Sequence, residues 1–379
     1  MQYFLTEDQI VLRNMCREFA EKELKPIAAE YDRKGEFPMH VYKKIVDMGI
    51  HCMEIPEEYG GPGLDYITVA IMREELAKGD AGFNVTLGAN NLGFKPLVVA
   101  GTEEQKRHFA DVVIPGGFAC FCLTEPGAGS DAGACRTTAT KVGDEYIING
   151  RKCFITNGGL ANIMTVVAST DRSSGVKGLS MFLVDADTPG VSVGKEEDKM
   201  GLRLSNTCDM IFEDVHVPAK NLIGKEGQGF KIAMKVLDRG RVGAAAVAVG
   251  IAQAAFEEAV KYAKQRITFG KPIIDNQAIS FMLADMETQI QAARQLVMYA
   301  CKIIDSETPD SKIGAMAKCF ASDVAMRVTT DAVQVLGGYG YMRDYPVEKL
   351  MRDAKIFQLF EGTNQIQRMV IGNNIKKEY

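Results

Sequence analysis

The order of apolar and polar positions divides the chain into a helical region, a strand-rich region and a second helical region. Up to about residue 115, apolar residues recur at helical spacing. The first helix shows this at Ile10, Met15 and Phe19, behind a capping box formed by Thr6 and Gln9. Further helices are expected over residues 38–48, 67–77 and 102–112.

From about residue 118 the apolar residues gather in shorter runs that predict strands. The pair Asn149-Gly150, which follows a run of β-forming residues, is a strong hairpin signal. Because the strands follow one another without helices between them, we expect an antiparallel sandwich or barrel and not a βαβ sheet. The expected strands cover residues 119–124, 137–142, 146–148, 163–169, 179–184, 190–193 and 210–212.

After a glycine-rich turn at residues 224–229 the helical period returns and lasts to the end. Alanines and a glycine crowd the middle of the first of these helices, so that neighbouring helices could approach it closely. Helices are expected over residues 230–265, 277–304 and 311–336, and from Pro346 onward. Four helices of this kind predict an up-and-down bundle.

The predicted fold is therefore an α+β multidomain protein. Its parts are an N-terminal α-helical domain at residues 1–117, a middle antiparallel β domain at 118–226 and a C-terminal four-helix bundle at 227–379. A length of 379 residues suits two or three domains with a large core.

Composition and charge exclude several classes of protein. A net charge of −5 without a clustered basic face argues against nucleic-acid binding. The nine cysteines form no CxxC pair and the four histidines lack metal-ligand spacing, so no metal site is expected.

The longest apolar runs, such as residues 244–255, are broken by Gly and Gln and are too short to cross a bilayer. No targeting segment is evident at the N-terminus, which predicts a bacterial cytoplasmic protein, or one of an organelle matrix if a leader has been removed.

One carboxylate, Glu361, lies among large apolar residues directly before Gly362. Glycine permits a tight turn, and Thr363 is a good cap for a following helix. A carboxylate in apolar surroundings has the raised pKa of a general base. The alternative is that Glu361 merely ends one helix at the surface.

A loop at residues 123–131, with the sequence LTEPGAGSD, offers free backbone N–H groups and the hydroxyls of Thr124 and Ser130. Such a loop could cradle a pyrophosphate or the edge of a heteroaromatic ring, or it could be purely structural. It is not a Rossmann fingerprint, because a strand and a hairpin are expected after it where that motif has a helix.

Four further segments end or interrupt predicted elements with polar residues and glycines. Each could contact a flat or phosphorylated ligand, or could simply be ordinary helix-ending or strand-ending sequence. They are FITNGG at residues 154–159, DRGR at 238–241, RITFGKP at 266–272 and QVLGGYG at 334–340.

Taken together, these segments resemble the acyl-CoA dehydrogenase family over essentially the whole chain. LTEPGAGSD, FITNGG, RITFGKP, QVLGGYGY, MRDAK and FEGTNQIQ occur in the order and at the spacing of that family. The chain looks most similar to its short- and medium-chain members, including bacterial butyryl-CoA dehydrogenases. The resemblance implies an FAD enzyme that removes the α- and β-hydrogens of an acyl-CoA, exchanges electrons with an electron-transferring flavoprotein and forms a homotetramer.

The resemblance also implies roles for individual residues. Glu361 would be the catalytic base that takes the α-proton, while the β-hydride passes to flavin N5. Substrate contacts would come from Ser130, Asp238, Arg239, Arg241 and Gly362. Cofactor contacts would come from Phe121, Leu123, Thr124, Gly129, Ser130, Phe154, Ile155, Thr156, Arg266, Thr268, Phe269, Gln277, Gln334, Val335, Leu336, Gly337, Gly338, Thr363, Asn364 and Gln365.

Two features refine this expectation. The residues at 266–277 and 334–338 would bind the FAD of a neighbouring subunit, so at least a dimer is implied. Isovaleryl- and long-chain-type relatives carry the base at the position of Gly240, which cannot serve here.

Two alternatives stay open. One is an anaerobic enoyl-CoA reductase for crotonyl-, aryl- or branched enoyl-CoA, in complex with an electron-transferring flavoprotein. The other is a non-catalytic subunit that binds acyl-CoA.

Overall fold

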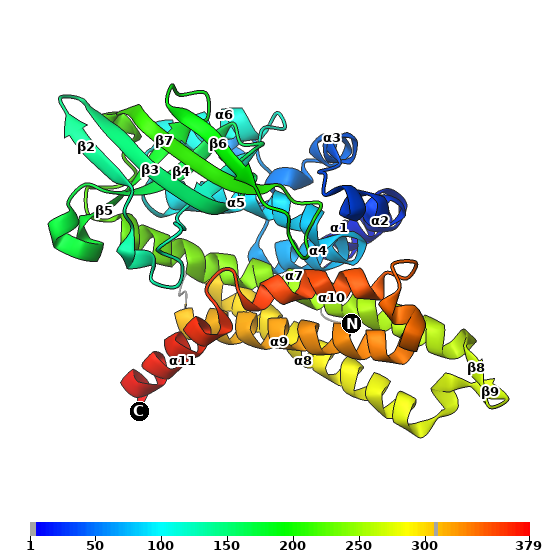
Figure 1. Cartoon of the computed structure of the whole chain (residues 1–379). Helices are drawn as coiled ribbons and strands as arrows, with labels where there is room; N and C mark the ends of the chain where they lie inside the picture. Colours follow the sequence, from blue (N-terminus) through cyan, green and yellow to red (C-terminus); the bar gives the residue numbers. More distant parts are fainter. Residues whose placement is uncertain (1–4, 307–309) are drawn as a thin grey trace.

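The computed structural model describes residues 5–306 and 310–379, and it places a sheet at one end of a set of long helices (Figure 1). The N-terminal helices pack beside the sheet, and the C-terminal helices run beneath both. This arrangement confirms the predicted fold class of helical, β and helical parts. The N-terminal helices are α1 (Glu7–Phe19), α2 (Lys25–Lys34), α3 (Met39–Asp47), α4 (Tyr66–Gly79), α5 (Ala81–Ala100) and α6 (Glu103–Val113).

The capping boxes confirm how the sequence sets the helix starts. Thr6 accepts a hydrogen bond from the Gln9 backbone N–H, and Thr102 accepts one from that of Gln105. Helix α5, in contrast, was not predicted. It is buried on most sides, so its apolar residues show no helical period, and it contains Pro96.

The seven-stranded sheet has the order β1-β4-β2-β3-β7-β6, and β5 pairs with β4 outside this path. Most pairs are antiparallel as predicted, but β1 pairs with β4 in parallel, with Ala119 opposite Ile163. One parallel pairing also joins β2 to β4. The strands are β1 (Ala119–Cys122), β2 (Thr138–Val142), β3 (Glu145–Thr156), β4 (Ile163–Ser169), β5 (Leu179–Asp185), β6 (Val191–Glu196) and β7 (Thr207–Pro218).

The hairpin predicted at Asn149-Gly150 is wrong. The turn between β2 and β3 is at Gly143-Asp144, because Val142 pairs with Glu145. Strand β3 runs on through Gly150, where the pairing with β7 shifts register at a bulge. A Cβ on Gly150 would lie 2.5 Å from Thr137 Oγ1, so this glycine permits a close approach within the sheet.

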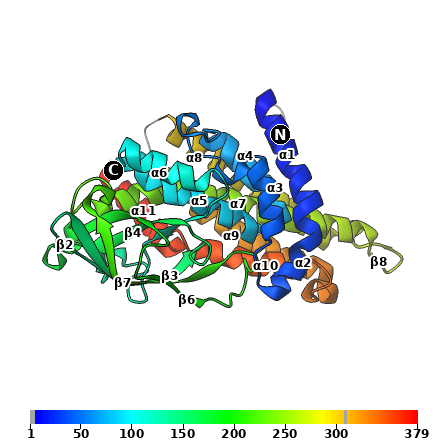
Figure 2. The same cartoon turned by 90° about the horizontal axis from the view of Figure 1, so that it is seen from above.

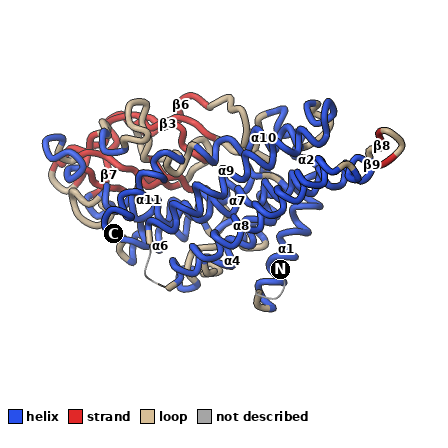
Figure 3. Tube along the Cα trace, turned by 90° about the horizontal axis from the view of Figure 1, so that it is seen from below, coloured by secondary structure: helices blue, strands red, loops and turns tan. Residues whose placement is uncertain are grey.

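The C-terminal helices begin and end almost where the sequence predicts. They are α7 (Gly229–Gln265), α8 (Gln277–Asp305), α9 (Ser311–Leu336), α10 (Val347–Lys355) and α11 (Asn364–Glu378). A small hairpin of β8 (Ile267–Thr268) and β9 (Lys271–Pro272) joins α7 to α8. It lies at the opposite end of the molecule from the sheet, as Figures 1 and 3 both show.

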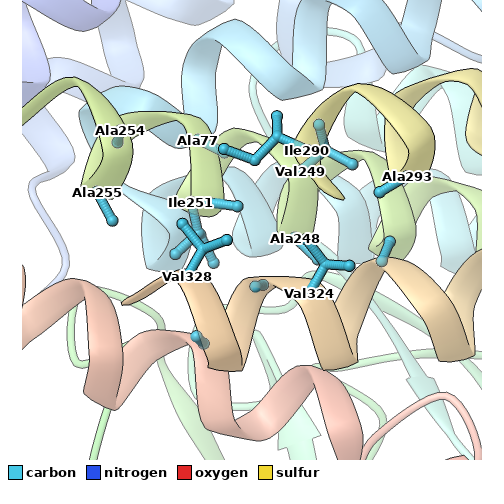
Figure 4. Packing of buried hydrophobic residues seen from close by; sticks show 14 of the residues in the cluster. Ala77, Ala248, Val249, Ile251, Ala254, Ala255, Ile290, Ala293, Val324 and Val328 are labelled. Atoms are coloured by element: carbon cyan, nitrogen blue, oxygen red, sulfur yellow. The ribbon is translucent and has the colours of Figure 1, made fainter. Parts of the chain in front are cut away.

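Small residues let α7 run through the centre of the packing. Figure 4 shows Ala248 and Ile251 of α7 facing Val324 and Val328 of α9. On another side, a Cβ on Gly250 would lie 2.3 Å from the Glu74 carbonyl oxygen, so glycine allows α7 to contact α4 directly. Seen from above, α7 extends under most of the molecule (Figure 2).

Helix α7 is also long and apolar enough by composition to cross a membrane, although its apolar run at 244–255 is broken by Gly250 and Gln253 and is too short to do so. In its most apolar window 72% of the residues are buried inside the structure. That burial is what a central core helix shows, and Figure 4 places its side chains against α9, α8 and α4.

Candidate active site

Glu361 lies in a left-handed turn that ends at α11. Its φ is +55° and that of Gly362 is +86°. The Gln367 side-chain amide donates hydrogen bonds to the carbonyl oxygens of Glu361 and Gly362, each at 2.9 Å. A non-glycine residue with positive φ stores strain that the surroundings must hold in place. The turn therefore fixes the backbone that carries the Glu361 carboxylate.

A buried lysine that sequence reasoning missed completes this clamp. Lys318 of α9 donates hydrogen bonds to the Gly362 carbonyl oxygen at 2.7 Å and to Asn364 Oδ1 at 2.9 Å. Burial lowers the pKa of Lys318 to about 8. The available signal was a charged residue between Ala317 and Cys319, which are buried on α9.

Asn364, which is predicted as a cofactor contact, holds the turn through its side chain. Its amide donates to the Cys319 carbonyl oxygen, to Ser322 and to Asp323, and its oxygen accepts from Lys318. The side chain is buried and its hydrogen-bonding capacity is used. Thr363 likewise caps α11 by accepting from the Ile366 N–H at 3.2 Å.

The Glu361 side chain borders a cavity of about 90 Å³. Helices α4, α5 and α7 supply most of its wall, and Thr156 of β3 and Phe360 complete it. Glu361 Oε2 is buried without a hydrogen-bond partner among the described residues. An unpaired carboxylate oxygen at a cavity is available to a ligand that enters there.

Burial raises the pKa of Glu361 above its ordinary value of 4.5. The positive charges of Arg241, Lys318, Lys95 and Arg73 act in the opposite direction but do not overcome burial. A carboxyl group with a raised pKa suits a general base near neutral pH. The raised pKa agrees with the interpretation of Glu361 as a general base and not with that of a residue that ends a helix at the surface.

The segment 238–241 does not break α7, contrary to the prediction. Helix α7 is continuous through Gly240, and a Cβ there would lie 2.9 Å from Glu361 Oε2. Asp238 and Arg241 form an ion pair one turn apart, and Arg241 is buried. Arg241 thus stands near Glu361 as a counter-charge, while Arg239 lines the cavity.

The predicted cofactor residues fall into two groups within one chain, and the first group lies near Glu361. Thr156 borders the Glu361 cavity and also a second pocket of about 350 Å³ beside it. Phe154, Leu359 and Phe360 line that second pocket. Phe154 is 63% exposed and has a φ of +57°, so the strand end turns an aromatic ring outward. The apolar and aromatic lining of this pocket suits an aromatic ligand.

Loop 123–131 is fixed to the protein by hydrogen bonds on one side and is exposed on the other. Glu125 is buried and accepts hydrogen bonds from Lys152 and from the N–H groups of Arg136 and Thr137. Burial acts to raise the pKa of Glu125, but Lys152 and these donors bring it down to about 2. A Cβ on Gly127 or Gly129 would meet open space. The loop is structural on one side and accessible to a ligand on the other, with Phe121, Leu123, Thr124 and Ser130 on the same segment.

The second group lies at the far end of the long helices. The Arg266 guanidinium lies over the Tyr339 ring at 5.8 Å, which joins the β8–β9 hairpin to the turn at residues 334–338. Phe269 is fully exposed at the tip of that hairpin. Figure 1 shows this end far from the sheet and from the start of α11, so one chain does not bring Arg266, Thr268 and Gln277 to Thr156.

Within residues 5–306 and 310–379, no group of His, Cys, Asp and Glu side chains is arranged to hold a metal ion. All nine cysteines are free.

Comparison with known proteins covers nearly the whole chain. Family models described as "Acyl-CoA dehydrogenase, N-terminal domain", "middle domain" and "C-terminal domain" match residues 6–116, 120–215 and 227–376. A short-chain-specific acyl-CoA dehydrogenase of Clostridium acetobutylicum is 47% identical over 99% of this chain and 100% of its own length.

Two solved structures have the same fold. The butyryl-CoA dehydrogenase of Megasphaera elsdenii is 47% identical, with a TM-score of 0.96 over 99% of this chain and 100% of its own. A chain from a structural study of the electron transferring flavoprotein of Acidaminococcus fermentans is 50% identical, with a TM-score of 0.96 over 99% of both chains.

Proposed function

The chain belongs to the acyl-CoA dehydrogenase family, and on that premise we propose that it oxidises a short, unbranched acyl-CoA to the trans-2-enoyl-CoA. The enzyme class is therefore an oxidoreductase acting on a CH–CH group. The observation that carries the proposal is the Glu361 carboxylate, which meets a cavity with one oxygen unpaired and its pKa raised by burial.

Glu361 is the base for the α-proton. Proton abstraction requires the ionised carboxylate, and the proton is then held on Glu361 while the α–β double bond forms. The Glu361 backbone N–H donates no hydrogen bond among the described turns and loops, so it is available to the thioester carbonyl oxygen. A donor at that oxygen stabilises the negative charge that develops as the α-proton leaves.

FAD is the redox cofactor of this family, and when bound it accepts the β-hydrogen as a hydride. Phe154 and Thr156 would hold its ring system in the pocket beside Glu361, and loop 123–131 would present Thr124 and Ser130 to its edge. These residues would thus position the α- and β-carbons of the acyl group between the base and the hydride acceptor.

A neighbouring subunit completes the cofactor site in this proposal. The β8–β9 hairpin, with Arg266 and Gln277 beside it, lies with the turn at 334–338 at the end of the molecule farthest from the sheet. A single chain therefore cannot bring these residues and Thr156 to the same FAD. A second copy supplies the distant group, which requires at least a dimer and fits a tetramer.

An electron-transferring flavoprotein is the proposed electron partner. The support is the chain 50% identical to this one, which comes from a structural study of such a flavoprotein. The same residues would serve the reverse reaction, in which protonated Glu361 delivers a proton to the α-carbon of an enoyl-CoA. Direction then depends on the potentials of the partner and the substrate.

The proposal is tested by kcat/KM for straight acyl-CoA chains of increasing length, from butyryl to dodecanoyl, with the purified FAD-loaded enzyme. We expect the largest value for butyryl-CoA and a steep fall beyond hexanoyl-CoA, because the cavity beside Glu361 has a volume of only about 90 Å³. A maximum at octanoyl-CoA or longer would contradict the short-chain assignment.

We expect kcat/KM to rise with pH as Glu361 loses its proton, with the inflection above 4.5 because burial raises its pKa. The folded protein holds this proton more tightly than the unfolded chain does. The stability contributed by Glu361 is therefore present below pH 4.5 and is lost as pH rises through the raised pKa. Activity and this contribution to the free energy of unfolding change in opposite directions.

The variant Lys318→Met tests whether the pH profile reports the titration of Glu361. Lys318 lowers the pKa of Glu361, so Lys318→Met is expected to move the inflection to higher pH. An unchanged inflection in this variant, or a flat profile in the unmodified enzyme, would show that another group controls the profile.

A further inference from the structure

Besides Glu361, four charged side chains line the cavity: Glu54, Arg73, Lys95 and Arg239. Arg73 of α4 and Lys95 of α5 both contact the carboxylate of Glu54, and the Arg73 Nη2 to Glu54 Oε1 distance is 3.1 Å. Arg73 is 7% exposed and Lys95 is 5% exposed. The Lys95 ammonium also lies over the Tyr66 ring, 5.3 Å from the ring centroid. A cavity built only for a hydrocarbon chain would not need buried charges.

The charges of this group do not balance. Arg73, Lys95 and Arg239 face the two carboxylates of Glu54 and Glu361 at this cavity. Burial acts to raise the pKa of Glu54, but Lys95 and Arg73 bring it below its ordinary value. The guanidinium of Arg73 has five N–H donors, but its one hydrogen bond among the described residues goes to Glu54. Its Nε is buried without a partner. A buried cation with free donors is costly unless an anion meets it.

Two glycines make room for the Arg73 guanidinium. A Cβ on Gly88 of α5 would lie 2.7 Å from Arg73 Nη1, and one on Gly243 of α7 would lie 3.1 Å from it. Any larger residue at either place would crowd the charge. The guanidinium therefore occupies a fitted place between α5 and α7 at the cavity.

The Glu361 carboxylate and the Arg73 guanidinium lie at the same cavity, each against a different glycine of α7. Gly240 lies against Glu361 Oε2, and Gly243 lies against Arg73 Nη1. Three residues of helix correspond to a rise of about 4.5 Å, which is the reach of a few carbon atoms. A short acyl chain whose α-carbon is beside Glu361 would thus end near Arg73.

We propose that the substrate of this enzyme is a short acyl-CoA whose acyl group ends in a second carboxylate, and that Arg73 pairs with this carboxylate. Lys95 supports the pair by supplying the second positive charge against Glu54. The inference rests on the proposed function and leaves its chemistry unchanged, because the α-proton still passes to Glu361 and the terminal carboxylate does not react. It names the substrate class that the cavity selects.

Glutaryl-CoA and pentanoyl-CoA are the matched probes, since both have five-carbon acyl chains and differ in ending in a carboxylate or a methyl group. The FAD-loaded enzyme is tested by flavin reduction, and the Glu361→Gln holoenzyme is titrated calorimetrically so that binding is measured without turnover. We expect glutaryl-CoA to be favoured by about 100-fold in kcat/KM and in Kd, the size of effect that a buried charge pair carries.

Arg73→Met tests the assignment, and Arg73→Lys is its charge-retaining control. Arg73→Met is expected to remove the preference for glutaryl-CoA or to reverse it, while Arg73→Lys keeps part of it. Thermal unfolding of both variants checks that they are folded. Because Arg73→Met leaves Glu54 paired only with Lys95, the double variant Glu54→Gln/Arg73→Met is measured as well, and it should show the same loss of preference.

The outcomes separate the inference from the proposed function. If pentanoyl- or butyryl-CoA reduces the flavin but glutaryl-CoA binds and reacts no better, or if Arg73→Met leaves the ratio unchanged, the inference is wrong and the proposed function stands. If none of these esters reduces the flavin, both are wrong.

Discussion

Glu361→Gln is expected to lower kcat by about three orders of magnitude or more, because a general base contributes about 10²–10⁴-fold. Glu54, the other carboxylate that lines the cavity, is already paired with Arg73 and Lys95. Glutamine keeps the size of the side chain but cannot accept the α-proton. The turn itself depends on the backbone of Glu361 and on Gln367 and Lys318, so the protein should fold and bind FAD. The measurement is steady-state oxidation of butyryl-CoA with a dye as electron acceptor.

Glu213→Gln is the matched control. It makes the same chemical change on an exposed residue of β7, and it is expected to leave turnover unchanged. If Glu361→Gln retained near-normal turnover while it bound the flavin normally, a different residue would have to be the base.

Gly240→Ala is expected to lower kcat by about 10–100-fold with little loss of stability. The new Cβ would lie 2.9 Å from Glu361 Oε2, so the carboxylate must move away from its position at the cavity. Small displacements of a reacting group are costly in rate. Alanine is also favoured over glycine within a helix by about 1 kcal/mol, which offsets part of the crowding. Activity and thermal unfolding should be measured on the same preparation.

Gly372→Ala in α11 serves as the control for helix propensity. A Cβ at Gly372 meets open space, so this variant should gain stability and keep its activity. If Gly240→Ala behaved in the same way, the packing of Gly240 against Glu361 would not constrain the reaction.

The elements that the sequence predicted well carry their own local signals. Helix α9 begins and ends at the predicted residues Ser311 and Leu336, because a strong apolar period stops at paired glycines. The capping boxes at Thr6 and Thr102 also fixed helix starts locally.

The elements that were missed depend on contacts between distant segments. Buried surroundings made α5 apolar on most sides and removed its period. Gly150 looked like a turn residue, but it is needed because Thr137 of the neighbouring segment lies so close. The sequence alone does not distinguish a glycine that permits close approach from one that permits a turn.

Half of the candidate site was predictable and half was not. Glu361 and Thr156 belong to short motifs, and the structure brings both to one cavity. Lys318, Arg73 and Lys95 lie on three different helices and contact the site through side chains only, so no motif contains them. Their common signal is a charge on a buried helix face, which indicates a paired group but not its partner.

In the proposed reaction, Glu361 takes the α-proton of a short acyl thioester beside a bound flavin. The most direct test of this step is the absorbance of the oxidised flavin after anaerobic mixing with butyryl-CoA, for the unmodified holoenzyme and for Glu361→Gln in parallel. We expect rapid bleaching in the unmodified enzyme and an unbleached flavin in the variant. Equal bleaching in both, or none in the unmodified enzyme, would contradict the proposed reaction.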